Sequence, residues 1–173
     1  MRRLVLNEDN IKIDEVEETV IRVKGLLKND KEELLIEHNN HTFQFPGGHW
    51  KLEEPLETTL IREIKEETGI TVEIETGPFM VIEEYYDNYL LTGKKRCNKI
   101  YYYALNSNEL PKVEEMNLSD LEKKTDFHLF YVPINDMEIF LEEQMKSKTI
   151  DDIIGFEMIE VMKEYKNHFK LGR

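Results

Sequence analysis

Three glutamates, Glu63, Glu66 and Glu67, lie within five positions of one another in the stretch LIREIKEETGI, residues 60–70. On a helix, which turns by about 100° per residue, their side chains would share one arc of about 100°. A cluster of carboxylates on a rigid helix offers the oxygen ligands that a hard cation such as Mg²⁺ prefers. A solvated acidic surface, with Arg62 paired to Glu66, is the alternative that these residue types leave open.

Two features of this stretch favour a site over a plain surface. Glu63 and Glu67 are like charges one turn apart, which destabilise a helix by a few tenths of a kcal/mol unless a positive group lies between them. Just upstream, Pro46-Gly47-Gly48 predicts a tight turn whose backbone can adopt positive φ and approach a ligand closely. The turn and the helix together could therefore hold a cation and leave room for water and phosphate oxygens.

The helix that carries the glutamates is predicted over residues 55–68. Pro55 suits the first turn because its φ is already fixed, and Gly69 suits a left-handed cap at the other end. Leu60 and Ile64 would form an apolar face, with Glu67 at its edge. We therefore expect the carboxylates to lie where the helix meets the protein core.

Strands are predicted on both sides of this helix. Residues 19–28 and 33–38 read as a hairpin, and residues 41–45 as a short extended segment that the PGG turn ends. Residues 71–91 alternate in polarity, with a bend at Gly77-Pro78, and would form a long hairpin with residues 96–105.

The C-terminal third is predicted to begin with a long polar loop, residues 106–126, with one helical turn near residues 118–124. The segment FHLFYVPI, residues 127–134, reads as a strand that Pro133 ends. A helix capped by Asn135 or Asp136 follows, and a last helix begins near Thr149 with one apolar face for packing on a sheet.

Composition predicts one soluble globular domain, residues 1–173. The length suits a single core, hydrophobic residues make up 40% and charged residues 34%, and no repeat or low-complexity linker divides the chain. The single cysteine, Cys97, excludes an internal disulfide within this sequence and fits a reducing cytoplasm. We read Cys97 as an ordinary strand residue.

The formal net charge of −13 limits the partners of the chain. Nucleic acid and anionic membrane surfaces both attract proteins through a positive face, so neither is an expected partner. No apolar run approaches the length that spans a membrane. A phosphate-containing substrate would need a positive attractor, and a bound divalent cation is the obvious one.

The spacing from Gly48 to Ile70 resembles the Nudix box, GX5EX7REUXEEXGU, in which U is an aliphatic residue. All nine specified positions match, namely Gly48, Glu54, Arg62, Glu63, Ile64, Glu66, Glu67, Gly69 and Ile70. The order of the predicted elements is also similar to that of the family. The resemblance implies an α/β fold, a Nudix-like α/β/α sandwich around a mixed β-sheet.

The resemblance also implies a role for each matched residue. Glu63, Glu66 and Glu67 would be ligands of Mg²⁺ or Mn²⁺, with the carbonyl of Gly47 as a further ligand. Arg62 would orient the neighbouring glutamates through charge-assisted hydrogen bonds. Glu63, Glu66 and Arg62 are thereby the implied catalytic residues of a metal-dependent hydrolase that cleaves a phosphoanhydride bond.

A carboxylate that takes the proton of the attacking water is the remaining requirement. In the family this group is often a glutamate in the loop before the late strand, and Glu66 itself is another candidate. The loop carboxylates here are Glu109, Glu114, Glu115, Asp120 and Glu122.

The substrate is a small molecule that the sequence does not specify further. The family acts on nucleoside diphosphates linked to another moiety, so nucleotide sugars, nucleoside triphosphates and dinucleoside polyphosphates all remain open. Trp50 is a candidate for stacking on a base, or else a half-buried anchor of its loop. Tyr86 lies near the position where dinucleoside polyphosphate enzymes place a tyrosine, whereas the proline that ADP-ribose enzymes often carry downstream of the box is absent.

One alternative function uses the same fold. A catalytically silent nucleotide-sensing domain could keep the scaffold without the chemistry, because fold does not determine function. The intact box favours the enzyme, since a sensor has no need of all its carboxylates. A homodimer is compatible with the sequence and is left open.

Overall fold

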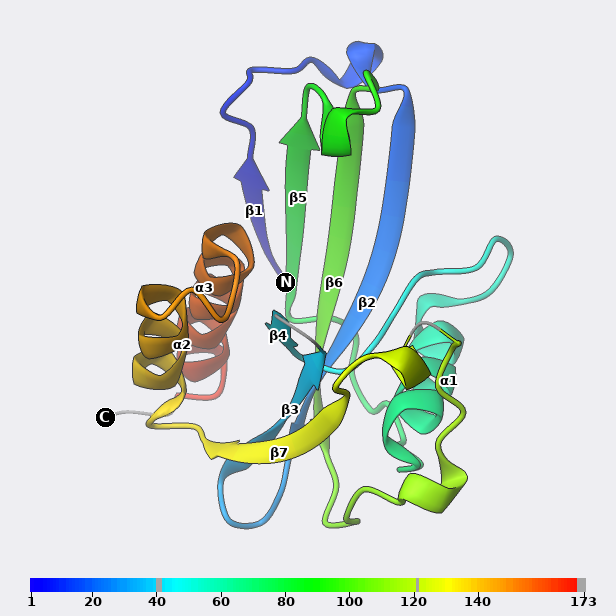
Figure 1. Cartoon of the computed structure of the whole chain (residues 1–173), viewed down its shortest axis with the longest axis vertical. Coiled ribbons are helices and arrows are strands. Elements are labelled where there is room, and N and C mark those ends of the chain that lie inside the picture. Colours follow the sequence, from blue (N-terminus) through cyan, green and yellow to red (C-terminus); the bar gives the residue numbers. More distant parts are fainter. Residues whose placement is uncertain (40–41, 121, 171–173) are drawn as a thin grey trace.

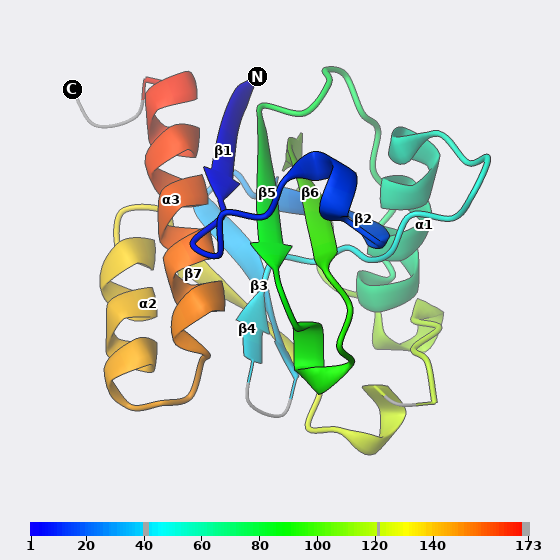
Figure 2. The ribbon, with the colours of Figure 1, turned by 90° about the horizontal axis from the view of Figure 1, so that it is seen from above.

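The computed structural model describes residues 1–39, 42–120 and 122–170. Within these ranges, seven strands form one mixed sheet in the order β1-β5-β6-β2-β3-β4, and β7 pairs with β3. Figures 1 and 2 show α1 on one side of the sheet and α2 with α3 on the other. The expected α/β/α sandwich around a mixed sheet is confirmed.

The strands and helices have the following bounds. The strands are β1 (Arg2–Leu6), β2 (Glu18–Lys28), β3 (Glu33–Asn39), β4 (Thr42–Gln44), β5 (Met80–Tyr86), β6 (Arg96–Asn106) and β7 (His128–Pro133). The α-helices are α1 (Leu56–Thr68), α2 (Met137–Lys146) and α3 (Asp152–His168). Short 3₁₀ turns occupy Ile13–Glu15, Tyr89–Leu91, Val113–Glu115 and Glu122–Lys124. None of the described helices is both long and apolar enough to cross a membrane.

Two strand pairs are parallel, β1 with β5 and β2 with β6, and the others are antiparallel. β2 and β3 pair only at Lys28↔Leu34 and then separate. Beyond this point, the segment after Phe45 lies along the edge of β2 in place of β3. The amide of Gly25 donates to the carbonyl of Pro46, and the amide of Val23 donates to the carbonyl of Gly48. The glycine turn is thus held against the middle of the sheet.

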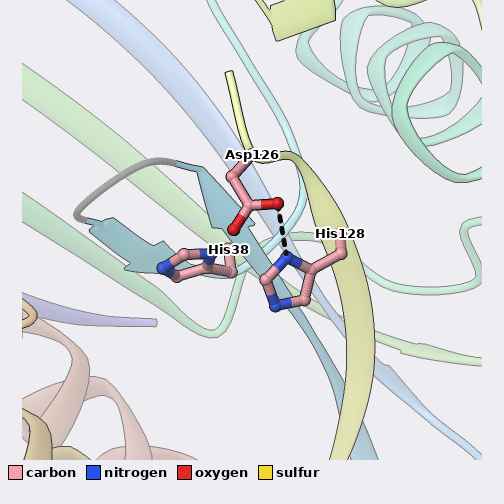
Figure 3. Close-up of side chains that lie close together, drawn as sticks. All are labelled: His38, Asp126 and His128. Atoms are coloured by element: carbon pink, nitrogen blue, oxygen red, sulfur yellow. Dashed lines mark ion pairs between the residues drawn. The ribbon is translucent and has the colours of Figure 1, made fainter.

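β7 extends the sheet on the other side of β3. The pairing is antiparallel from Glu33↔Pro133 to His38↔His128. His38 and His128 therefore lie side by side where β7 begins, close to Asp126 (Figure 3). This pairing returns the chain from the long loop to the sheet.

Each face of the sheet carries its own hydrophobic core. Leu60 and Ile64 of α1 pack with Leu35 of β3 and Tyr103 of β6 on one face. On the opposite face, α2 and α3 contribute residues such as Leu141, Met158 and Met162. The predicted packing of the last helix on a sheet is confirmed, since Met158, Val161, Met162 and Tyr165 of its apolar stripe are buried.

The prediction of one strand over residues 71–91 is wrong, because only Met80–Tyr86 is a strand. Residues 71–79 are irregular, and their alternation arises because Val72 and Ile74 pack on the α1 core. Such packing produces the same periodicity as a strand without strand pairing. At the other end, Leu90 and Leu91 are exposed in a turn with positive φ.

The remaining element predictions agree closely with the structure. The extended segment predicted over residues 41–45 is confirmed in part by β4. Two residues of the predicted elements lie outside the described ranges, His41 of this segment and Leu121 of the helical turn. Asp136 is the cap position of α2, although its side chain makes no capping hydrogen bond. α3 begins slightly later than expected, and the carboxylate of Asp151 accepts from the amide of Ile153 at 2.8 Å. β1 was not predicted, because its short run is stabilised by pairing with β5.

The end of α1 is tied to the long loop through Gly69. Gly69 has φ of 70°, as expected for a left-handed cap. A Cβ at this position would collide with the carbonyl of Lys112, whose amide donates to the carbonyl of Thr68 at 2.9 Å. Further along the loop, the amide of Asn117 donates to the carbonyl of Glu66 at 2.8 Å. The loop therefore follows the end of α1 that carries the glutamates.

We expect Gly69→Ala to lower the free energy of unfolding by at least about 1 kcal/mol, because the left-handed backbone disfavours a Cβ and Lys112 blocks it. Gly77→Ala is the matched control, since nothing lies within 4 Å of a Cβ there. Its stability should stay within about 0.5 kcal/mol of the parent protein. Urea denaturation of the three proteins measures the difference, and equal stabilities would contradict the role of Gly69.

Candidate active site

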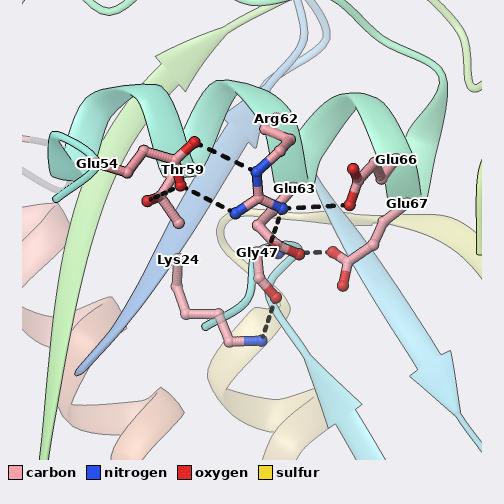
Figure 4. Close-up of polar contacts among 8 residues, drawn as sticks. All are labelled: Lys24, Gly47, Glu54, Thr59, Arg62, Glu63, Glu66 and Glu67. Carbon is pink, nitrogen blue, oxygen red and sulfur yellow. Dashed lines mark hydrogen bonds and ion pairs between the residues drawn. The ribbon is translucent and has the colours of Figure 1, made fainter. Parts of the chain in front are cut away.

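Arg62 lies at the centre of the carboxylate cluster on α1 (Figure 4). Its Nη1 donates to Glu63 Oε1 at 2.6 Å and to Glu66 Oε2 at 3.3 Å, while its Nη2 donates to Glu54 Oε2 at 3.1 Å. The hydroxyl of Thr59 also donates to Glu54 Oε2, at 2.7 Å. The hydrogen bond from Arg62 is the main reason that the pKa of Glu54 is lowered. Arg62 thus separates and orients three of the carboxylates of the box.

The pairing of Arg62 with Glu66 was expected of a plain acidic surface, and the structure contains it. A plain acidic surface does not account for two further contacts, because Arg62 also donates hydrogen bonds to Glu63 and Glu54. A guanidinium shared by several carboxylates restricts the directions in which their remaining oxygens can point. The arrangement leaves Glu63 and Glu66 with oxygen atoms that can serve another positive group.

Glu67 reaches from the same helix into a buried polar network. Its Oε2 accepts from the amide of Gly47 at 2.7 Å. Lys24 Nζ donates to the carbonyl of Gly47 at 3.2 Å and to Gln44 Oε1 at 2.9 Å, and Gln44 Nε2 donates to Glu37 Oε1 at 2.6 Å. Glu67, Glu37 and Lys24 are only 6%, 0% and 7% exposed. One lysine therefore faces two buried carboxylates.

The electrostatics of this network follow from its burial. Burial raises the pKa of Glu67 well above its ordinary value, and the nearby charge of Glu37 raises it further. Burial is also the main cause of the raised pKa of Glu37, and Lys24 opposes the shift in both groups. Carboxylates in this situation favour the approach of a positive charge.

The glycine turn brings backbone and glutamates into contact. Gly47 has φ of 136°, and a Cβ there would collide with the carbonyl of Val23. A Cβ on Gly48 would overlap the carboxylate of Glu63. Any side chain at these two positions would push the turn away from the sheet and from α1. The close approach predicted for this turn is present.

A cavity of about 420 Å³ lies between the glutamates and the long loop. It is lined by Glu63, Glu66, Glu67, Asn117, Leu118, Ser119, Asp120, Glu122 and Lys123. A neighbouring cavity of about 340 Å³ shares Glu63, Glu67 and Glu122 and adds Lys24, Gly47 and Arg22, among others. The structure thus brings the three box glutamates together around open space.

The five loop carboxylates separate into two groups. Asp120 and Glu122 line the glutamate cavity. Glu109 instead accepts from Lys112 at 2.6 Å, Glu115 pairs with Lys65, and Glu114 is exposed outside the cavity. Glu122 lines both neighbouring cavities. Glu122 and Asp120 are therefore the loop carboxylates placed to act at the glutamates.

The donor atoms around the cavity suit a hard divalent cation. Glu63, Glu66 and Glu67 supply carboxylate oxygens, and among the described residues Glu37 Oε2 is buried without a hydrogen-bond partner. Oxygen donors of this kind fit Mg²⁺ or Mn²⁺ better than softer metals. The carbonyl of Gly47 faces Lys24 here and keeps a second lone pair for another partner. The residues present therefore fit the implied metal.

The two candidate substrate residues lie in different surroundings. The indole of Trp50 donates to the carbonyl of Glu54, which matches the role of a half-buried loop anchor. Tyr86 lines a cavity of about 390 Å³ together with Tyr85, Asp152, Phe156 and others. Its hydroxyl donates to Glu84 Oε2 at 3.0 Å.

A polar strip on the α3 face of the sheet was missed by sequence reasoning. Glu84 and Asn98 are buried side by side, and Glu84 Oε1 and Asn98 Oδ1 have no hydrogen-bond partner among the described residues. Tyr102 donates to Glu157 on α3. Burial and the neighbouring Glu84 raise the pKa of Glu157. Buried polar atoms without a partner call for an explanation, and hydrogen bonds to a ligand would supply one.

Known proteins resemble the chain in sequence. The model of the NUDIX domain matches residues 18–152. The ADP-ribose pyrophosphatase of Methanocaldococcus jannaschii is 35% identical over 60 residues, which is 32% of this chain and 36% of that protein. The match thus spans about a third of that relative.

Solved structures show the same fold at low sequence identity. A NUDIX hydrolase from Nitrosomonas europaea aligns with a TM-score of 0.56 and 13% identity over 87% of this chain and 90% of its own. The MutT protein from Methanosarcina mazei Go1 aligns with a TM-score of 0.54 and 19% identity over 87% and 98%.

The family match includes every residue of the box and the elements from β2 to α2. The fold agrees with that of the Nudix structures, and the three glutamates of the box converge on one cavity. The protein therefore belongs to the Nudix hydrolase family.

Proposed function

We propose that this protein is a divalent-metal-dependent pyrophosphohydrolase. Its substrate would contain a phosphoanhydride bond in a nucleoside diphosphate linked to another moiety, such as a nucleotide sugar, a nucleoside triphosphate or a dinucleoside polyphosphate. The observation that carries the proposal is the convergence of Glu63, Glu66 and Glu67 with Glu122 on one cavity. The name of the archaeal relative, ADP-ribose pyrophosphatase, supports the same bond type.

Glu63, Glu66 and Glu67 would hold Mg²⁺ or Mn²⁺, with the carbonyl of Gly47 as a further ligand. When bound, such a cation neutralises phosphate oxygens and makes a coordinated water more acidic. Arg62 keeps the oxygens of Glu63 and Glu66 in place through its two hydrogen bonds. In a chain of net charge −13, this site is where a polyphosphate would meet compensating positive charge.

Glu122 is the residue that we assign as acceptor of the water's proton. It lines the cavity opposite the box glutamates, and its Oε2 accepts from the amide of Ser119 at 2.6 Å, which fixes the carboxylate on its 3₁₀ turn. A carboxylate held in this way needs little reorganisation to receive a proton. Asp120 and Glu66 line the same cavity and are the other candidates.

The part of the substrate beyond the phosphates would lie on the α3 face of the sheet. Glu84, which lines the cavity of Tyr86, raises the pKa of the buried Glu157, whereas Lys24 and Arg22, which line the second glutamate cavity, lower it. Charges of both places therefore act on one buried carboxyl group. The amide and carboxyl groups there are suited to hydrogen bonds with a base or a sugar, with Tyr86 at the rim.

The alternative function, a catalytically silent nucleotide-sensing domain, accounts less well for the residues around the glutamate cavity. A sensor would bind a nucleotide without needing a proton acceptor opposite its metal ligands, yet Glu122 and Asp120 both line that cavity. A cytoplasmic location is part of the proposal, and a free, buried thiol such as that of Cys97 is compatible with a reducing compartment. Assembly as a homodimer stays open.

The proposal predicts activity that requires a metal. With Mg²⁺, the protein should release phosphate or nucleotide products from at least one compound in a panel of nucleotide sugars, nucleoside triphosphates and dinucleoside polyphosphates, and EDTA should abolish this release. Glu66→Gln should lower kcat by at least about 100-fold, because it removes charge that faces the metal. The exposed Glu142→Gln on α2 is the control and should match the parent. Turnover that persists in EDTA would refute the metal requirement.

A second prediction concerns the proton acceptor. Glu122→Gln should lower kcat by about 100-fold, because the amide cannot accept a proton. Glu114→Gln, in the same loop but outside the cavity, should leave kcat unchanged. Steady-state kinetics, with circular dichroism as a folding check, makes the comparison. Normal turnover in the Glu122 variant would assign the role to Asp120 or Glu66.

A third prediction concerns the substrate's non-phosphate part. Tyr86→Ala should raise KM by at least about tenfold and change kcat little, because a rim contact contributes to binding in ground and transition states alike. Tyr101→Ala, on the opposite face of the sheet, should not change KM. Kinetics with the substrate found in the panel tests this, and an equal KM in both variants would remove Tyr86 from the binding surface.

A further inference from the structure

Two histidines and an aspartate form a cluster at the edge of the sheet (Figure 3). His38 lies on β3, His128 is the first residue of β7, and Asp126 precedes that strand. One potential ligand atom from each lies within 4.8 Å of the others. Because His38 and His128 are directly paired in the β3–β7 register, the backbone itself holds the two imidazoles together.

The hydrogen bonding of the cluster points to a missing positive partner. Nδ1 of His38 is buried and, in the described part of the chain, has no hydrogen-bond partner. A buried nitrogen without a partner destabilises the fold unless an ion or another group satisfies it. His128 Nδ1 lies 3.9 Å from Asp126 Oδ1, which is too long for a hydrogen bond. The buried Nδ1 of His38 is therefore the atom of the cluster that a bound cation would satisfy.

Packing against aromatic neighbours explains where the rings of His38 and His128 lie, but it does not explain why Nδ1 of His38 is buried without a hydrogen-bond partner among the described residues. The ring of His38 lies 4.6 Å from that of Phe43, and the ring of His128 lies 5.9 Å from that of Phe130. A phenylalanine would make the same contacts at either position. Ring packing alone therefore does not require histidine at these two positions. Coordination of an ion by the imidazole nitrogens does require it.

We propose that His38, Asp126 and His128 form a binding site for a transition-metal ion of the Zn²⁺ class, with water as the fourth ligand. Two imidazoles and one carboxylate are a common ligand set for such ions. Tetrahedral coordination at about 2.1 Å places ligand atoms about 3.4 Å apart. Asp126 and His128 are both exposed, so rotation of their side chains can close the remaining distance.

This site differs in chemistry and in place from the glutamate cavity. Its nitrogen donors favour Zn²⁺ or Co²⁺ over Mg²⁺, whereas the cavity on α1 offers oxygen donors. Glu37 precedes His38 on β3, and successive strand residues point to opposite faces, so Glu37 faces the carboxylates while His38 faces Phe43. The two metals would therefore occupy opposite faces of one strand.

An ion at this site would stabilise the return of the long loop to the sheet. Asp126 follows Glu122 by four residues, and both belong to the segment that leads from the active-site cavity into β7. A ligand bond from Asp126 to an ion held by β3 would hold the end of that segment. The effect on the placement of Glu122 rests on the proposed function, but the binding of the metal does not.

The test uses the whole chain, stripped of metal and kept in excess Mg²⁺ so that the glutamate cavity is saturated. Titration with Co²⁺ should give about one bound ion with the visible absorption bands of a nitrogen-containing, low-coordinate site, and Zn²⁺ should displace it. His128→Gln should weaken Co²⁺ binding by at least about tenfold. His168→Gln, which removes an exposed histidine of α3, is the matched control and should bind as the parent does.

A second variant and a second measurement keep the test decisive. Asp126→Asn should also weaken binding, and Zn²⁺ should raise the melting temperature of the parent and of His168→Gln but not of either ligand variant. Circular dichroism without metal checks that both variants fold. Equal Co²⁺ affinity in the parent and both ligand variants would overturn the proposal, as would Co²⁺ that excess Mg²⁺ removes.

Discussion

Repulsion among carboxylates is the constraint on which the architecture of the proposed active site depends. Glu63, Glu66 and Glu67 share one end of α1, and Glu37 approaches Glu67 from the sheet. In a partly desolvated place, such like charges destabilise the folded state unless cations or amides compensate them. Two positive side chains do so here, Arg62 along the helix and Lys24 beneath it.

These two compensating groups act differently. Arg62 bonds Glu54, Glu63 and Glu66 from the same helix and its preceding loop, so it orients these carboxylates by direct hydrogen bonds. Lys24 instead reaches from β2 to the carbonyl of Gly47, which links the glycine turn to the sheet. The residual negative charge that neither group neutralises suits the cavity to the divalent cation that we propose.

The separation of β2 from β3 creates the place for this site. After the single pairing at Lys28↔Leu34 the strands diverge, and the segment from Pro46 to Trp50 occupies the free edge of β2. If β3 paired with β2 along its whole length, it would occupy the backbone groups of Val23 and Gly25 that now bond the glycine turn. The gap lets Gly47 reach Glu67, and it keeps buried backbone groups hydrogen-bonded through the turn.

The sequence by itself determined the local parts of this protein. The spacing of the box, the helix that ends at Gly69 and the packing face of the last helix all follow from short-range periodicity and turn residues, which act over a few positions. The same local rules failed for residues 71–79, because packing on the α1 core mimics the alternation of a strand. They also missed β1, whose five residues owe their conformation to pairing with β5.

Only the tertiary structure decided which distant side chains share the site. Glu37 and Lys24 come from strands far from the box, and their burial next to Glu67 has no signal in the sequence around them. Five loop carboxylates looked equivalent until the hydrogen bonds from the loop to Thr68 and Glu66 placed Glu122 and Asp120 at the cavity. The meeting of His38 with His128 likewise depends on the register of β3 and β7. Long-range pairing of this kind is set by the packing of the whole sheet, which no local pattern encodes.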